Sequence, residues 1–133
     1  MSTGEQRPVW HLAERSHWEE ALASGSYERS TRGATLAEVG FVHGSYPEQL
    51  PGVVAALYAS AGEEMVVLEI DVTRLGEQTP VRIEPGDPHD PGGEHYPHLY
   101  GPVPVRSVVR TRPARVDRGW LDLGSWEPGP GDR

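Results

Sequence analysis

The clearest alternation of apolar and polar residues in the chain lies between positions 64 and 72. On one face of an extended chain every residue is apolar: Val66, Leu68, Ile70 and Val72. Glu69 stands in the middle of the opposite face. The pattern and the branched side chains predict a strand with one face in the core. The face that carries Glu69 is expected to meet either solvent or a cleft.

Shorter segments with the same kind of pattern predict four more strands. They are residues 8–13, 41–43, 79–84 and 103–112. In the segment 79–84, Arg82 and Glu84 share the face opposite to Val81 and Ile83.

Helix signals occur only in the first half of the chain. Ser16 and Glu19 have the spacing of a capping box, which predicts a helix of about two turns that ends at Gly25. Ser45 and Glu48 repeat that spacing and predict a turn at 47–50, followed by the main helix at 51–60. Residues 26–35 are expected to form a loop, and residues 36–39 a single helical turn.

Two early helices followed mainly by strands predict an α+β domain with split or bent antiparallel β-sheets. With 133 residues, the chain has room for one such domain, expected over residues 1–123. Residues 124–133 are rich in glycine and proline and are expected to form a flexible tail.

Composition narrows the chemistry. The chain has no cysteine, which excludes thiolate nucleophiles and cysteine-bound zinc. It has no lysine, which excludes a lysine Schiff base. The net charge of −8 argues against a nucleic-acid or anionic membrane surface and favours a small-molecule ligand. No apolar run is long enough to span a bilayer, and a cytoplasmic protein is expected.

The elbow at His43-Gly44-Ser45 is the first candidate site. An imidazole at a strand end, next to a glycine and a helix start, stands where backbone can approach a ligand closely. Ser45 has two interpretations, since a hydroxyl at this position can cap the following helix as well as bind substrate. His11 likewise fits either a core histidine or a ligand-binding one.

Three further residues are candidates on chemical grounds. Glu69 within a strand needs a partner, for which Arg82 is one candidate, or a catalytic role. His98 and Tyr100 point the same way in an extended chain, which places an acid–base group and a phenol on one wall. A plain rigid loop at 97–102 is the alternative.

The segment 87–98 contains three histidines and three carboxylates within twelve residues. Such a segment suits a metal site, although no regular element fixes the spacing of its side chains. A solvated lid over the cleft is the favoured interpretation, with no metal among the expected ligands.

Four motifs resemble those of the domain-of-unknown-function family numbered 952. They are Val9-Trp10-His11-Leu12-Ala13, Gly40-Phe41-Val42-His43-Gly44-Ser45 with Pro47-Glu48-Gln49-Leu50, Leu68-Glu69-Ile70-Asp71, and Pro97-His98-Leu99-Tyr100-Gly101-Pro102. The resemblance implies a fold similar to the ADP-ribosyltransferase superfamily, in which two small sheets form a cleft that binds NAD.

The same resemblance implies roles for individual residues. His11 matches a first-strand histidine that binds the adenosine ribose of NAD in several such transferases. His43 and Ser45 match a segment beside the nicotinamide pocket. The sequence lacks a Gln-x-Glu motif after residue 95, which the transferases carry.

The sequence therefore predicts a small enzyme that binds a polar small molecule in one cleft. His43, Glu69 and His98 are the expected acid–base or transfer residues. The expected substrate-binding residues are His11, Ser45, Tyr46, Arg82 and Tyr100. NAD is the cofactor that the resemblance suggests. Two alternatives stay open: a binding module with the same cleft and no turnover, and a metal-dependent hydrolase or isomerase that uses residues 87–98.

Overall fold

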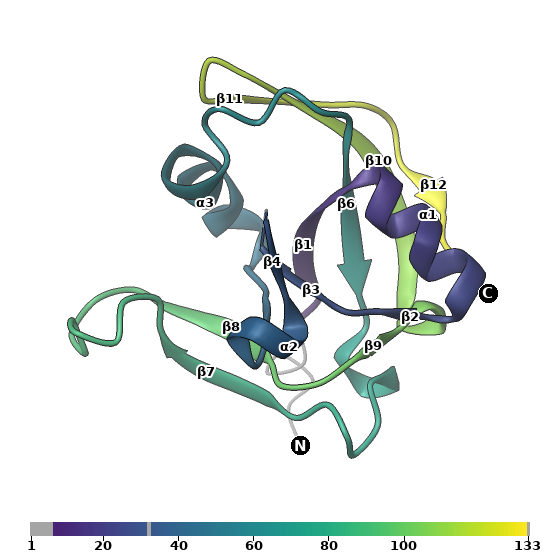
Figure 1. Ribbon diagram of the computed structural model, residues 1–133, viewed down its shortest axis with the longest axis horizontal. Coiled ribbons are helices and arrows are strands. Elements are labelled where there is room, and N and C mark those ends of the chain that lie inside the picture. Colours follow the sequence, from purple (N-terminus) through teal and green to yellow (C-terminus); the bar gives the residue numbers. More distant parts are fainter. Residues whose placement is uncertain (1–6, 32, 133) are drawn as a thin grey trace.

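The computed structural model describes residues 7–31 and 33–132. Its larger sheet has the strand order β1-β6-β10-β11, with β12 also paired to β10 (Figure 1). These strands are β1 (Val9–Glu14), β6 (Met65–Ile70), β10 (Val108–Asp117), β11 (Trp120–Leu123) and β12 (Glu127–Pro128). A smaller antiparallel sheet has the order β5-β8-β7, from β5 (Val42–His43), β8 (His95–Leu99) and β7 (Val81–Pro85).

The remaining elements are short. Two small ladders pair β2 (Ser26–Tyr27) with β9 (Val103–Pro104), and β3 (Arg29–Thr31) with β4 (Ala34–Thr35). The helices are α1 (Arg15–Ser24), α2 (Leu36–Val39) and α3 (Leu50–Leu57), with 3₁₀ turns at Pro47–Gln49, Val72–Arg74 and Val105–Ser107. Within the described residues, none of the helices has the length and apolar character needed to cross a bilayer.

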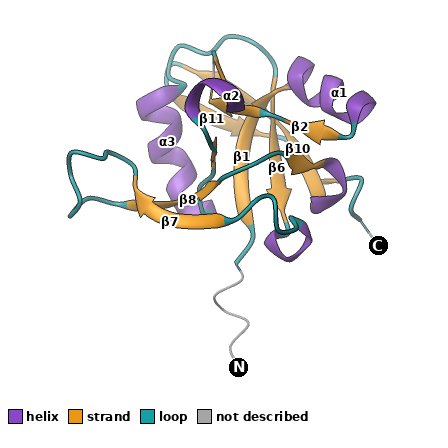
Figure 2. Ribbon diagram, turned by 60° about the horizontal axis from the view of Figure 1, so that its bottom comes forward, coloured by secondary structure: helices purple, strands orange, loops and turns teal. Residues whose placement is uncertain are grey.

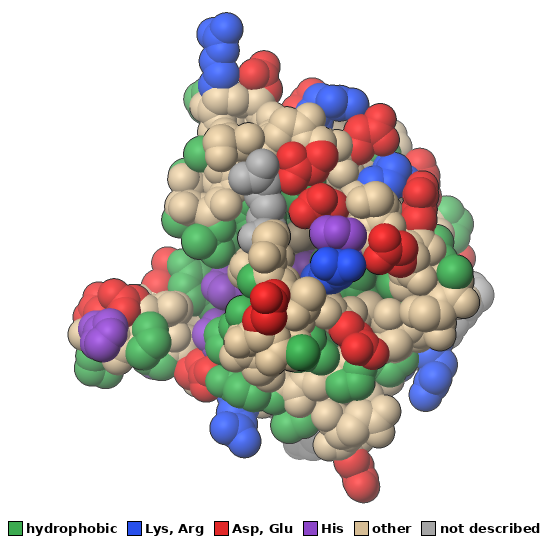
Figure 3. Space-filling view, in the orientation of Figure 1, with side chains coloured by type: hydrophobic (Ala, Val, Ile, Leu, Met, Phe, Trp, Pro, Cys, Tyr) green, Lys and Arg blue, Asp and Glu red, His purple; other side chains and the backbone are tan. Residues whose placement is uncertain are grey.

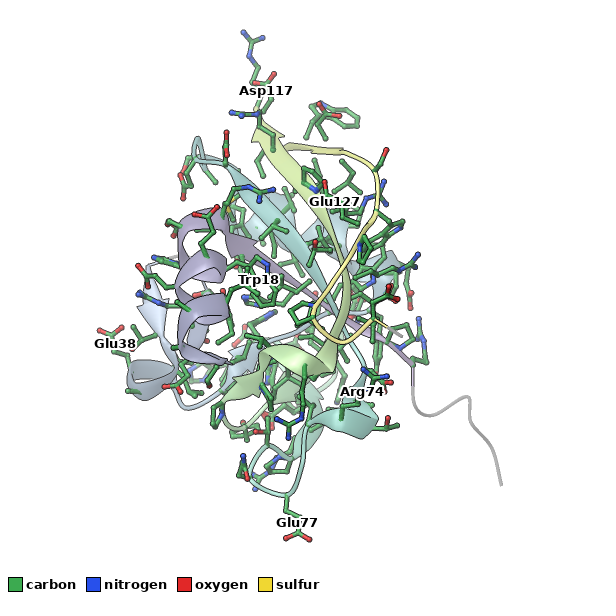
Figure 4. All side chains as sticks on the ribbon, turned by 90° about the vertical axis from the view of Figure 1, so that its right-hand side faces the viewer. Trp18, Glu38, Arg74, Glu77, Asp117 and Glu127 are labelled. Carbon is green, nitrogen blue, oxygen red and sulfur yellow. The ribbon has the colours of Figure 1, made fainter. Side chains whose placement is uncertain are left out.

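The larger sheet is covered on both faces, which explains why β6 is apolar at nearly every position. On one face Val66, Leu68 and Ile70 join a core that includes Trp18 and Ala21 of α1. On the other face Met65 and Val67 join Leu50, Val53 and Val54 of α3. Figure 2 shows α1 and α3 on either side of the sheet, and Figure 4 shows Trp18 pointing from α1 toward it. The prediction that one face of this strand meets solvent or a cleft is wrong at Val67, which is fully buried.

Both predicted serine caps are wrong, although the turn predicted at 47–50 is confirmed by the 3₁₀ turn Pro47–Gln49. Helix α1 begins at Arg15, and its N-cap, Glu14, makes no side-chain cap bond. At the second site, the N-cap is Tyr46, whose N–H donates to Gln49 Oε1 at 2.9 Å. The predicted stop at Gly25 is confirmed by its left-handed backbone, with φ of 94°.

Two segments differ from the predicted secondary structure. Residues 26–35, expected as a loop, contain β2, β3 and β4, because short strands with few branched residues leave little periodic signal. The predicted strand at 103–112 is interrupted by the turn Val105–Ser107, and the real strand runs on to Asp117. A tight turn at Arg118 and Gly119, both with positive φ, then leads into β11.

The segment from Gly124 was expected to be a flexible tail, and this prediction is wrong. Strand β12 pairs with Arg110 and Thr111 of β10. Trp126 lies 5.5 Å from Trp10, ring to ring, and Arg110 stacks over it at 3.9 Å. The described C-terminal residues are therefore part of the domain and are held by aromatic contacts. The glycine- and proline-rich composition of the segment gave no indication of these contacts.

Candidate functional site

The register of the smaller sheet gathers the polar residues of three strands on one face. His43 of β5 and Arg82 of β7 both pair with His98 of β8, and Glu84 pairs with Tyr96. Side chains of paired residues lie on the same side of a sheet. The structure therefore brings two predicted site residues, His43 and His98, together, with their ring centroids 5.1 Å apart.

His98 forms a pair with Glu84 in the middle of this face. Its Nδ1 lies 3.0 Å from Glu84 Oε2, and the hydroxyl of Tyr100 donates to the same oxygen. The two hydrogen bonds, from Tyr100 and then His98, lower the pKa of the Glu84 carboxyl. The carboxylate accepts only, so Nδ1 of His98 carries a proton that it donates to Glu84.

The Nε2 atom of His98 is buried, and no hydrogen-bond partner among the described residues reaches it. The side chain is only 2% exposed, and Phe41 stacks on its ring at 4.0 Å. His43 of β5 is its neighbour on the side of β8 away from β7, with the two ring centroids 5.1 Å apart. Buried polar atoms without partners are rare in folded proteins, so this atom calls for an explanation.

His43 neighbours His98 and lines a hollow of about 270 Å³. The other walls come from α3 and from the β7–β8 connection, with Tyr96 beside His43 at 5.4 Å. Figure 3 shows histidine side chains at the base of the arm that this connection forms. Burial, reinforced by His98 and His11, lowers the pKa of His43 to about 4. The ring is therefore uncharged at neutral pH.

Gly44 explains the strand-to-helix elbow. A Cβ at this residue would lie 2.6 Å from the carbonyl oxygen of Pro97 and 2.6 Å from a methyl group of Val9. The Gly44 N–H donates to that same Pro97 carbonyl at 3.1 Å. A glycine is thus required where β5 leaves the sheet, and it fixes the backbone directly after His43.

His11 lies in the core and makes no contact with the hollow. Its Nδ1–H donates to the His43 carbonyl at 2.8 Å, and its Nε2 accepts from the Tyr27 hydroxyl at 2.9 Å. Burial lowers the pKa of His11 to about 4. Both ring nitrogens are used inside the protein, so His11 supports the backbone of His43 and has no atom left for a ligand.

The other expected substrate-binding residues lie around the site at different depths. Ser45 is buried, and its backbone pairs with Trp10 in an isolated bridge. Tyr46 lies under the guanidinium of Arg7 at 4.1 Å. Arg82 stacks over Tyr100 at 4.7 Å, on the side of the smaller sheet where Tyr100 bonds Glu84. Of these residues, Tyr100 is the one that donates a hydrogen bond to Glu84, the carboxylate that also bonds His98.

Glu69 lies apart from the histidines. Its carboxylate accepts two bonds from Arg110, both at 3.0 Å, and one from the indole N–H of Trp10 at 2.9 Å. Trp10 and His11 point to opposite faces of β1, so Glu69 is on the face opposite to His11. Its partner is Arg110 and not Arg82, and the ion pair has a structural role beside Trp126.

The acidic and histidine-rich segment does not gather its side chains. Among the described residues, no three His, Asp or Glu groups lie close enough to hold a metal ion. Asp87 Oδ1 accepts the His89 N–H, His95 bonds the Gly93 carbonyl, and His98 belongs to the sheet. The segment forms the outer wall of the hollow.

Sequence reasoning did not assign Glu84, Tyr96 or Phe41 to the site. Glu84 was within reach, because β7 and β8 are adjacent strands whose alternation places a carboxylate beside His98. Tyr96 was also within reach, because it lies two residues before His98 and shares its face. Phe41 carries no such signal, since it lies outside the strands.

The comparisons with known proteins agree with this architecture. Residues 12–111 match the family described as "Protein of unknown function (DUF952)", and the chain belongs to that family. Two solved structures of protein CC0527 from Caulobacter crescentus are similar, at 27% identity with a TM-score of 0.68, and, for a double mutant, 26% with 0.67. In each case 86% of this chain and 93% of the other chain are covered. No curated protein matches the sequence.

Proposed function

We propose that the protein is a small enzyme that binds a polar molecule in the hollow beside His43, and that His43 exchanges a proton with it. The observation that carries this proposal is the buried Nε2 of His98, which lacks a partner while Nδ1 is fixed by Glu84. A carboxylate that orients an imidazole is a recurrent arrangement behind acid–base groups. In this protein His43 lines the hollow, whereas His98 and Glu84 do not. His98 is therefore a positioning residue, and His43 is the residue that contacts the ligand.

The family resemblance suggests an ADP-ribosyltransferase fold with NAD as the ligand. One observation argues against NAD. The ribose contact implied for His11 would require an imidazole with a free nitrogen, and both nitrogens of His11 are bonded internally. NAD is therefore kept as one compound in the test and is not the favoured ligand.

A binding module without turnover is the second candidate. It is favoured by the pKa of about 4 at His43, because a ring that holds its proton so weakly is a poor general base at neutral pH. A ligand whose binding raises the pKa of His43 would again favour the enzyme.

The test is a ligand screen by thermal shift on the full chain and on two variants. A compound at about 100 times its dissociation constant adds about 2.7 kcal/mol to the free energy of unfolding. The expected result is that His43→Ala abolishes the shift of any stabilising compound, whereas the exposed His89→Gln leaves it unchanged. Turnover of that compound, lost in His43→Ala and reduced in Glu84→Gln, supports an enzyme.

A stabilising compound that acts equally on His43→Ala and on the unmodified chain would contradict the proposed site. Binding that needs His43 but yields no product with any stabilising compound would favour the binding module.

A further inference from the structure

The charge of the hollow beside His43 identifies a class of ligand, an inference that rests on the proposed function. The connection between β7 and β8 contributes three acidic residues to the lining, Asp87, Asp90 and Glu94. Asp87 also accepts from the His89 N–H, and Glu94 from Gln49. No arginine is among the described residues that line it. His43 adds no positive charge at neutral pH, because its pKa is lowered to about 4 by burial. The lining is therefore negative on one side and neutral elsewhere.

The wall opposite to the carboxylates is apolar. It is made by Val53, Ala56 and Leu57 of α3. Leu57 is 46% exposed, whereas Val53 and Val54 of the same helix are buried against the sheet. An exposed leucine beside an acidic wall suits a ligand with one apolar part and one charged end.

The polar atoms near the hollow mainly accept hydrogen bonds. Carboxylates accept only, and next to His43 the buried Nε2 of the 2% exposed His98 has no hydrogen-bond partner among the described residues. The aromatic face of Tyr96, in the same lining, attracts cations. A set of acceptors is complementary to an ammonium group, which has three donors and no acceptor.

We propose that the hollow binds a small organic amine in its protonated form, with the ammonium toward the carboxylates and Tyr96 and the apolar part against α3. A volume of about 270 Å³ limits the ligand to the size of a small metabolite. An anionic ligand such as a dinucleotide would place its phosphates against three carboxylates.

The test uses three probes of nearly the same shape and different charge: benzylamine, benzyl alcohol and benzoate. Each is titrated into the full chain, and the NMR resonances of the His43 and Tyr96 rings are followed, with NAD as a fourth probe. The expected order of affinity is benzylamine, then benzyl alcohol, then benzoate, with the benzylamine affinity falling as salt is added.

Isosteric variants separate charge from shape. The triple variant Asp87→Asn, Asp90→Asn and Glu94→Gln is expected to weaken benzylamine binding at least about tenfold, which is about 1.4 kcal/mol. The matched control is Asp117→Asn, an exposed carboxylate that does not line the hollow and that Figure 4 shows at the tip of the β10–β11 hairpin. This control is expected to change nothing.

Three outcomes would overturn the inference. Benzoate or NAD that binds at His43 more tightly than benzylamine refutes the amine class but leaves the proposed site intact. Benzylamine binding that is unaffected by the triple variant also refutes it. No movement of the His43 and Tyr96 resonances with any of the four probes counts against both the amine class and the site.

Discussion

Acidification from pH 7 to about 4.5 is expected to lower the free energy of unfolding by about 4 kcal/mol, at about 2 kcal/mol for each of two imidazoles. In the folded protein the pKa values of His11 and His43 are about 4, whereas the ordinary value in an unfolded chain is 6.5. The unfolded chain therefore binds protons on these rings at a pH where the folded chain does not. Stability is complete above about pH 6.5 and is lost as the pH falls toward 4.

The measurement is chemical denaturation at half-unit steps of pH. Carboxyls with lowered pKa, such as Glu84, add to the loss mainly below about pH 4.5, so the upper window reports the histidines. His11→Gln is expected to remove about half of the slope, whatever its stability at pH 7, and His43→Gln is expected to do the same. The exposed His89→Gln serves as control. An unchanged slope in both buried-histidine variants would show that these rings do not titrate as described.

Gly44→Ala is expected to destabilise the fold by about 3 kcal/mol, because the added methyl group meets backbone on one side and a core side chain on the other. The contacts would be 2.6 Å to the Pro97 carbonyl oxygen and 2.6 Å to Val9. Relief requires β5 to move away from β8, which also displaces His43 from His98.

Gly52→Ala is the matched control. Gly52 lies within α3, and a Cβ there meets nothing within 4 Å. Alanine favours the helix, so this variant is expected to be about 0.5–1 kcal/mol more stable. Denaturation midpoints of the two variants should therefore move in opposite directions. A Gly44→Ala variant as stable as the unmodified chain would mean that the elbow is not held as closely as the structure has it.

The elements with long periodic patterns were predictable from the sequence. The strand around Leu68, the turn before the main helix and the α+β class follow from alternation and from the order of the elements. The short strands β2 to β4 were not, because two or three residues give no period. The hairpin end at Arg118 and the packing of Trp126 depend on contacts between distant segments.

The candidate site was predictable in part. The pairing of His43 with His98 combines two motifs that the sequence had singled out, and Tyr100 joins them as its spacing suggested. The family resemblance placed His11 at the site, and the position of Glu69 within a strand made it a candidate. Their side chains point to opposite faces of the larger sheet, a fact that depends on strand pairing and on the partners Tyr27 and Arg110.

The state of the His98 ring tests the central claim most directly. Long-range nitrogen–proton NMR correlations of the imidazoles at neutral pH would show which nitrogen carries the proton. The structure predicts a proton on Nδ1, which faces Glu84, and a change at the unpartnered Nε2 when a ligand binds beside His43. Glu84→Gln is expected to disturb this state. A proton on Nε2 alone, or a ring indifferent to both Glu84→Gln and bound ligand, would contradict the account.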